Sequence, residues 1–121
     1  MEVGIPMAKK DELQLDQKQL TEAWENTLPE CIHHGDQAVV KADEANERSL
    51  RVTIRTAGHQ QYDFDFLVTY VDSREVAVSL VDVEKAGVSI DERTETIQQL
   101  IQDYTRHLHE CAQALHHLTH A

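Results

Sequence analysis

The stretch from residue 50 to residue 70, LRVTIRTAGHQQYDFDFLVTY, decides the fold. On both sides of Gly58, apolar and polar side chains alternate with a period of two, which is typical of half-buried β-strands. The segment around the glycine predicts a turn, so the two strands form an antiparallel hairpin. Four of the six aromatic residues lie in the second strand, and we therefore expect that strand to be central in a sheet.

The register of this hairpin follows from both of its faces. Pairing residues whose numbers sum to 118 sets apolar side chains opposite one another, as with Ile54 and Phe64. The same register sets Arg55 opposite Asp63 on the other face, which is a favourable cross-strand charge pair. A shift by one residue would turn Asp63 into the core. The sequence therefore predicts a single register for residues 48–70.

A helix precedes the hairpin. Asp16 is a suitable N-cap, and Gln19 completes a capping box three residues later. Apolar residues then recur at helical spacing from Leu20 to Leu28. Pro29 disfavours helical backbone angles at the residue before it, so the regular helix should end there.

Two shorter strands and a long helix complete the pattern. Residues 38–42 and 76–80 read as strands on either side of the hairpin. From Ile97 to Leu118 apolar residues recur in alternating steps of four and three, after a capping box at residues 89–92. A helix of about 28 residues would be roughly 42 Å long. Strands of ordinary length span only about 20 Å, so we expect the last helical turns to extend past the sheet.

The order of elements predicts an α+β two-layer sandwich: a helix, a four-stranded antiparallel meander and a long C-terminal helix, with both helices on one sheet face. We expect residues 11–121 to form a single domain and residues 1–10 to be a flexible N-terminal lead-in. No apolar run has the length of a membrane span or of a signal peptide, so we expect a cytoplasmic protein.

The charge balance disfavours several classes of partner. The 121 residues include 22 Asp and Glu against 11 Lys and Arg, a formal net charge of −11. Nucleic acids and anionic membranes would be repelled, so neither is expected as a partner. The GxxxxGK[ST], GxGxxG and GxSxG motifs are missing, which gives nucleotide-dependent, redox or hydrolase chemistry no support. We therefore expect no enzymatic activity and no cofactor.

The leading hypothesis is a small acidic protein-binding module, namely an adaptor, a chaperone-like protein or a regulatory protein. The apolar stripe past the end of the sheet needs cover, which a symmetric homodimer would supply. A further protein partner, of unknown identity, would bind as well. A variant of this hypothesis is an acidic surface that mimics nucleic acid and occupies a basic partner. The expected interface residues are Leu108, Cys111, Leu115 and Leu118 on the helix and Leu67 and Val81 on the outer sheet face.

Cysteine and histidine suggest an alternative. The chain has 8 His and 2 Cys, and His107 lies one helical turn before Cys111. Together with Cys31 and His33 (or His34), these residues would supply the thiolate and imidazole ligands that zinc prefers. The alternative function is therefore a zinc-binding protein or a small metalloenzyme.

Two other interpretations of the cysteines stay open. No spacing matches a zinc-finger pattern, so Cys111 is also compatible with a plain core position and the histidines with solvated side chains. A nucleophilic thiol at Cys31 or Cys111 would need a depressed pKa, exposure and an oriented base. His116 and His120, also four residues apart, are a second pair that could bind a metal at the end of the helix.

Overall fold

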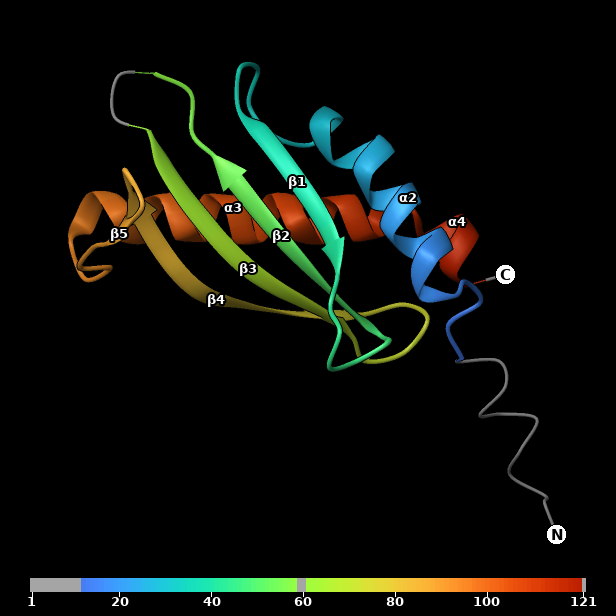
Figure 1. The fold of residues 1–121 in the computed structure, drawn as a ribbon. Coiled ribbons are helices and arrows are strands. Elements are labelled where there is room, and N and C mark those ends of the chain that lie inside the picture. The colour runs from blue at the N-terminus through green and yellow to red at the C-terminus, as the bar shows by residue number, and fades with distance from the viewer. Residues whose placement is uncertain (1–11, 59–60, 121) are drawn as a thin grey trace, which may run out of the picture.

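The computed structural model describes residues 12–58 and 61–120 of the chain (Figure 1). The predicted lead-in at residues 1–10 and most of the turn expected at 58–60 lie outside the described residues. The elements in chain order are α2 (Gln17–Thr27), the 3₁₀ turn η1 (Leu28–Glu30), β1 (Gln37–Ala42), β2 (Ser49–Arg55), β3 (Tyr62–Tyr70), β4 (Val76–Lys85), β5 (Val88–Ser89), α3 (Glu95–Ala114) and α4 (His116–Thr119).

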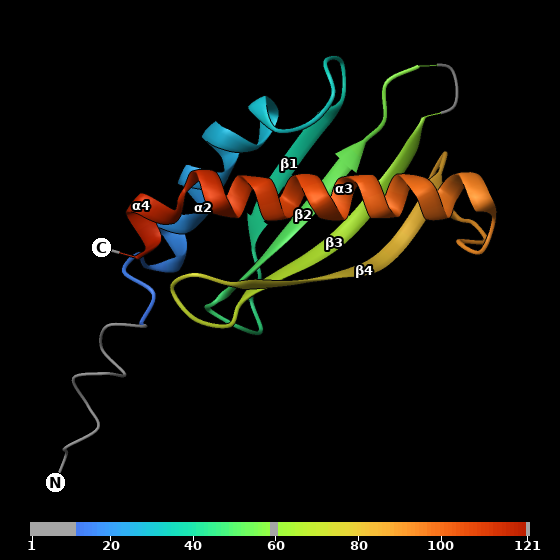
Figure 2. The same cartoon turned by 180° about the vertical axis from the view of Figure 1, so that it is seen from behind.

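The strands form one antiparallel sheet in the order β1-β2-β3-β4-β5. The predicted register of the central hairpin is confirmed, because Ile54 pairs with Phe64 and Arg55 with Asp63. The Arg55 guanidinium donates from Nε to Asp63 Oδ1 over 2.8 Å and from a terminal nitrogen to Oδ2 over 3.1 Å. Both helices lie on the same face of the sheet, so the predicted α+β two-layer architecture is confirmed (Figures 1 and 2).

The core lies between the sheet and the helices, and two polar bonds cross it. Trp24 of α2 donates from Nε1 to the hydroxyl of Tyr70 on β3 over 3.1 Å. Tyr104 of α3 donates its hydroxyl to Asp36 Oδ2, just before β1, over 2.8 Å. Burial raises the pKa of Tyr70 to about 12, so this phenol stays neutral and hydrogen-bonded at ordinary pH. Each helix is thus tied to the sheet by one buried aromatic side chain.

The prediction of four strands was short by one. β4 continues to Lys85, and Ala86 and Gly87 then adopt positive φ angles of 55° and 80°. Positive φ at both central residues is the geometry of a tight hairpin turn, which returns the chain as β5. Because β5 uses Val88 and Ser89, the helix begins later than expected. Thr94 is its N-cap, in place of a residue within 89–92.

The predicted long helix is divided. α3 has 20 residues and ends where Leu115 leaves helical geometry, with φ of −96° and ψ of 3°. The four-residue α4 then turns so that Thr119 donates its hydroxyl to the carbonyl oxygen of Ser73 over 2.9 Å. This bond to the β3–β4 turn is the physical reason for the break. No helix formed by the described residues has both the length and the apolar character needed to cross a membrane.

The expectation that the C-terminal helical turns extend past the sheet without cover was wrong. α2 lies beside the end of α3, as both views show (Figures 1 and 2). Leu108 and Leu115 are consequently buried inside the chain, at 0% and 3% exposure. The stripe is therefore covered as far as Leu115 within the same molecule, whereas Leu118 is 41% exposed.

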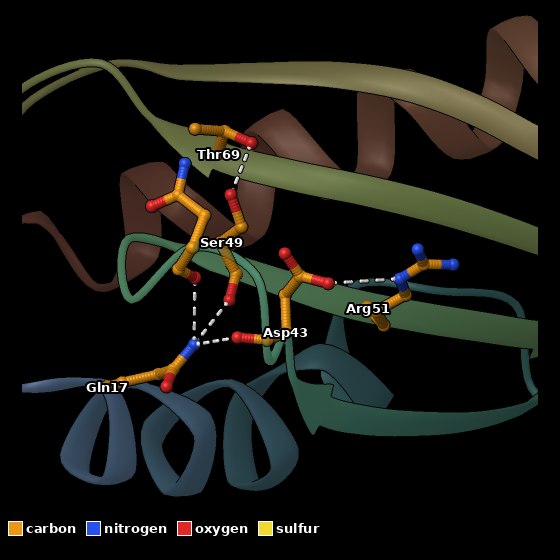
Figure 3. Close-up of polar contacts among 6 residues, drawn as sticks. Gln17, Asp43, Ser49, Arg51 and Thr69 are labelled. Atoms are coloured by element: carbon orange, nitrogen blue, oxygen red, sulfur yellow. Dashed lines mark hydrogen bonds and ion pairs between the residues drawn. The ribbon is translucent and has the colours of Figure 1, made fainter.

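Gln17, at the start of α2, fixes this helix to the β1–β2 turn (Figure 3). Its Nε2 donates to the carbonyl oxygens of Asp43 (2.8 Å), Asn46 (3.0 Å) and Ser49 (3.0 Å). An amide nitrogen has two hydrogens, so the three acceptors share them. Ser49 in turn bonds to Thr69 on β3 over 2.7 Å. One side chain thereby connects the first helix to the turn between two strands.

We predict that Gln17→Glu destabilises the protein by about 1–3 kcal/mol, because a carboxylate would face three carbonyl oxygens that have lost their donor. Urea denaturation followed by circular dichroism measures the change in the free energy of unfolding. Gln102→Glu, at an exposed position of α3, adds the same charge and serves as the control. Equal midpoints for the two variants would show that this contact does not stabilise the fold.

Candidate functional site

Four predicted metal-ligand residues come together in the structure as two pairs. We call Cys31, His33, His107 and Cys111 the Cys–His cluster. The thiols of Cys31 and Cys111 are near enough for each to affect the pKa of the other. The rings of His33 and His107 meet edge to face, with 5.2 Å between their centroids. The connector after α2 therefore reaches the second half of α3.

Local structure explains how the connector reaches the helix. η1 adds a tight turn after α2, closed by a hydrogen bond from the Cys31 N–H to the Leu28 carbonyl oxygen over 2.8 Å. Ile32 is 9% exposed and belongs to the core, so it holds the connector against the helix layer. On α3, His107 and Cys111 lie one turn apart and project towards the same side.

The environment of the two thiols favours their neutral form. Burial, more than any other cause, raises the pKa of Cys31. Burial also raises the pKa of Cys111, and the neighbouring Cys31 adds to this effect. A nucleophile or a metal ligand has to be a thiolate. The surroundings of this pair therefore suit two packed thiols better than a reactive one.

His107 has one nitrogen that is bonded and one that is not. Its Nδ1 lies 2.9 Å from Glu110 Oε1, and donation along this contact holds the pKa of Glu110 below its usual range. Its Nε2 is buried and has no hydrogen-bond partner among the described residues. Within residues 12–58 and 61–120, no three or more His, Cys, Asp and Glu side chains are arranged to hold a metal ion. Zinc binding by the Cys–His cluster thus remains a prediction.

The second histidine pair packs at the C-terminal end. The rings of His116 and His120 are stacked with 5.1 Å between their centroids. His120 Nδ1 lies 2.6 Å from the Ser73 hydroxyl, so this ring contributes to attaching α4 to the β3–β4 turn. His34, the alternative ligand to His33, is exposed.

The side of the sheet that carries no helix is a second candidate site, which we call the open face (Figure 1). Two apolar side chains lie at its centre. Leu67 of β3 is half-buried and pairs with Ser79 of β4, and Val81, two residues after Ser79, is 48% exposed. The β1 and β2 side of the face carries the basic residues Lys41, Arg51 and Arg55. The β3 and β4 side carries the acidic residues Asp63, Asp65, Asp82 and Glu84.

The acidic side of the open face arises from an irregularity in β4. The register shifts between Asp65 and Phe66, so that Asp65 pairs with Asp82 and Asp63 with Glu84. Burial and the three nearby aspartates raise the pKa of Glu84, which shows that these carboxylates repel one another. The sequence pattern did not reveal this group, because the predicted strand ended at residue 80. The available signal was the pair of successive apolar residues Leu80 and Val81, after which the alternation resumes with Asp82 and Glu84 as its polar members.

The predicted interface residues divide into two sets. Leu108, Cys111 and Leu115 are at most 3% exposed within their own chain, so the prediction that they form an interface was wrong. The physical reason is the cover that α2 provides. Leu118 is 41% exposed, and Val81 and the half-buried Leu67 lie on the open face. These last three residues remain available to a partner.

Comparison of the chain with protein-family models, with curated proteins and with solved structures finds no match.

We predict that both thiols react slowly with a small disulfide reagent in the folded protein, and Cys111 more slowly than Cys31, because burial keeps each one protonated. Near pH 8, each should react at least about tenfold more slowly than in denaturant, since each pKa unit changes the thiolate fraction about tenfold. Absorbance of the released thiol measures the two rates. Cys31→Ser and Cys111→Ala assign the phases, and a folded-state rate for Cys111 equal to that in denaturant would contradict the prediction.

Proposed function

We propose that this chain is a non-enzymatic protein-binding module that acts as a dimer and holds its partner on the open face of the sheet. The observation that carries the proposal is a sheet face without helices, with Leu67 and the 48% exposed Val81 at its centre. Apolar side chains surrounded by polar ones on an exposed surface are typical of protein interaction sites. A cytoplasmic setting belongs to this proposal, because free thiols persist there.

The charges on the open face suggest the chemistry of the partner. Arg55 already neutralises Asp63, whose pKa it lowers through their hydrogen bonds. No Lys or Arg side chain of the described residues forms such an ion pair with Asp65, Asp82 or Glu84. A segment that presents Lys or Arg beside apolar side chains would neutralise these carboxylates and cover Leu67. The partner is therefore a basic, apolar protein segment, whereas nucleic acid and lipid surfaces are not partners.

We predict that a labelled synthetic peptide in which valine alternates with lysine binds the protein, and that a peptide of valine and glutamate does not. Fluorescence anisotropy measures the dissociation constant. Leu67→Lys should weaken binding of the lysine peptide by at least about tenfold, because it places a cation at the apolar centre. Added salt should weaken binding too, since the attraction between exposed charges is screened.

The control for this experiment is Val71→Lys. Val71 is 57% exposed and lies in the β3–β4 turn, outside both strands and four residues beyond Leu67, so the same charge change there should leave peptide binding unaltered. Equal binding of the two peptides, or equal loss in the two variants, would contradict the proposed site.

Zinc binding is the second candidate function, favoured by the two contacts that assemble the Cys–His cluster. Because the thiols are held protonated, we predict that elemental analysis of the purified protein finds zinc well below one atom per chain. One zinc atom per chain, lost in Cys111→Ser but retained in a His117→Ala control, would establish the metal-binding alternative instead.

A further inference from the structure

The outer edge of β4 is unpaired over most of its length. β3 pairs with one side of β4 along its length except at Val81. On the other side β5 pairs with Glu84 and Lys85, and the Ile90 N–H donates to the Val83 carbonyl oxygen. Among the described residues no strand pairs with that side between residues 76 and 82, and both views show no element beyond it (Figures 1 and 2). An unpaired edge presents backbone N–H and C=O groups at the spacing that another strand requires.

Before the bulge at Val81, this edge lacks the features that usually protect a strand. Residues 76–81, VAVSLV, contain no charge and no proline and are rich in β-branched side chains. The other edge strand, β1, carries Lys41 and has α2 packed beside it. In a chain with a net charge of −11, an uncharged strand is also where a second copy meets least repulsion. These features favour pairing at β4 over pairing at β1.

We propose that the edge of β4 pairs antiparallel with β4 of a second copy of this chain, so that one sheet continues across a two-fold symmetric dimer. The inference rests on the dimeric state in the proposed function and goes beyond it by assigning the surface. It does not depend on peptide binding to the open face. A two-fold axis across an antiparallel strand pair uses the same residues from both copies, as a closed dimer requires.

The sequence of β4 is self-complementary in one register. In an antiparallel pair of strands the two paired residue numbers always have the same sum. An even sum pairs even-numbered residues with even-numbered ones, so that side chains from the same face of the sheet lie opposite each other. A sum of 156 uses the regular stretch Val76–Leu80, which ends before the bulge. Val76 then faces Leu80 of the second copy on the helix side, and Val78 lies on the two-fold axis. On the open side, Ala77 faces Ser79 of the second copy, and both of these residues are exposed in the single chain.

Two neighbouring features fit the same register. A groove of ≈ 430 Å³ between the start of β4 and α3, lined by residues that include Val76 and Ala112, opens beside this edge. Leu80 of the second copy would approach it, because it faces Val76. The sum of 156 also brings the exposed Arg74 towards Asp82 of the second copy, which sets opposite charges together at both ends of the paired strands.

Sedimentation equilibrium of the full chain tests the inference. We expect a species of twice the chain mass of 13.8 kDa. The double variant Ala77→Asp and Ser79→Asp should raise the dissociation constant of this dimer by at least about tenfold, because like charges then lie opposite each other across the strands. The matched control is Gln37→Asp with Val39→Asp, which adds two carboxylates at the same spacing on exposed positions of β1 and should leave the dimer intact.

A second measurement needs no variant. Amide hydrogen exchange in residues 76–82 should slow as protein concentration rises, while exchange in β1 should not change. A dimer that resists the β4 substitutions and shows no such protection would overturn the edge pairing and leave the dimeric state standing. A monomer at every concentration would overturn both, and the peptide experiment would still report separately on the open face.

Discussion

In the pairing of β2 with β3, two amphipathic strands meet in a register that sends their large apolar side chains, apart from Leu67, to the helix side of the sheet. Val52, Ile54 and Phe64 are fully buried against the helices, whereas Arg55 and Asp63 bond on the other side. A slip of one residue would turn the apolar side chains of a whole strand towards solvent and its charged side chains into the core, so this register is strongly favoured over its neighbours. The places of β1, β4 and both helices depend on this pairing.

The helices are then positioned by a few polar bonds placed on an apolar background. Gln17 connects α2 to the β1–β2 turn, Tyr70 accepts the Trp24 indole, and Tyr104 bonds to Asp36. Burial supplies most of the stabilisation and is not directional, whereas hydrogen bonds select one arrangement. Because both helices are used on one side, the opposite face of the sheet is left to solvent. The packing of both helices on one side of the sheet therefore produces both the two-layer architecture and the exposed face on which we propose that a partner binds.

The sequence predicted those features that depend on local periodicity. The hairpin register and the Asp16 capping box are confirmed. Both could be predicted because they depend on residues that are close together in the sequence. The burial of Leu115 was not predictable in this way, because it depends on where α2 packs, a contact between distant segments. The helix break before α4 likewise depends on Ser73 in a remote turn. The proximity of Cys31 to Cys111 was predicted only as part of the zinc-site alternative, because the spacing of the two residues in the sequence does not show whether the connector reaches α3.

The bond between Trp24 and Tyr70 has a practical consequence. Trp24 is the single tryptophan of the chain, it is 0% exposed, and it sits where α2 meets β3. Its fluorescence therefore reports on one boundary, the docking of the first helix, and not on the molecule as an average. The far-ultraviolet signal of the helices and sheet reports on all elements together. Any separation between these two signals during unfolding would show that α2 leaves the sheet as a unit of its own.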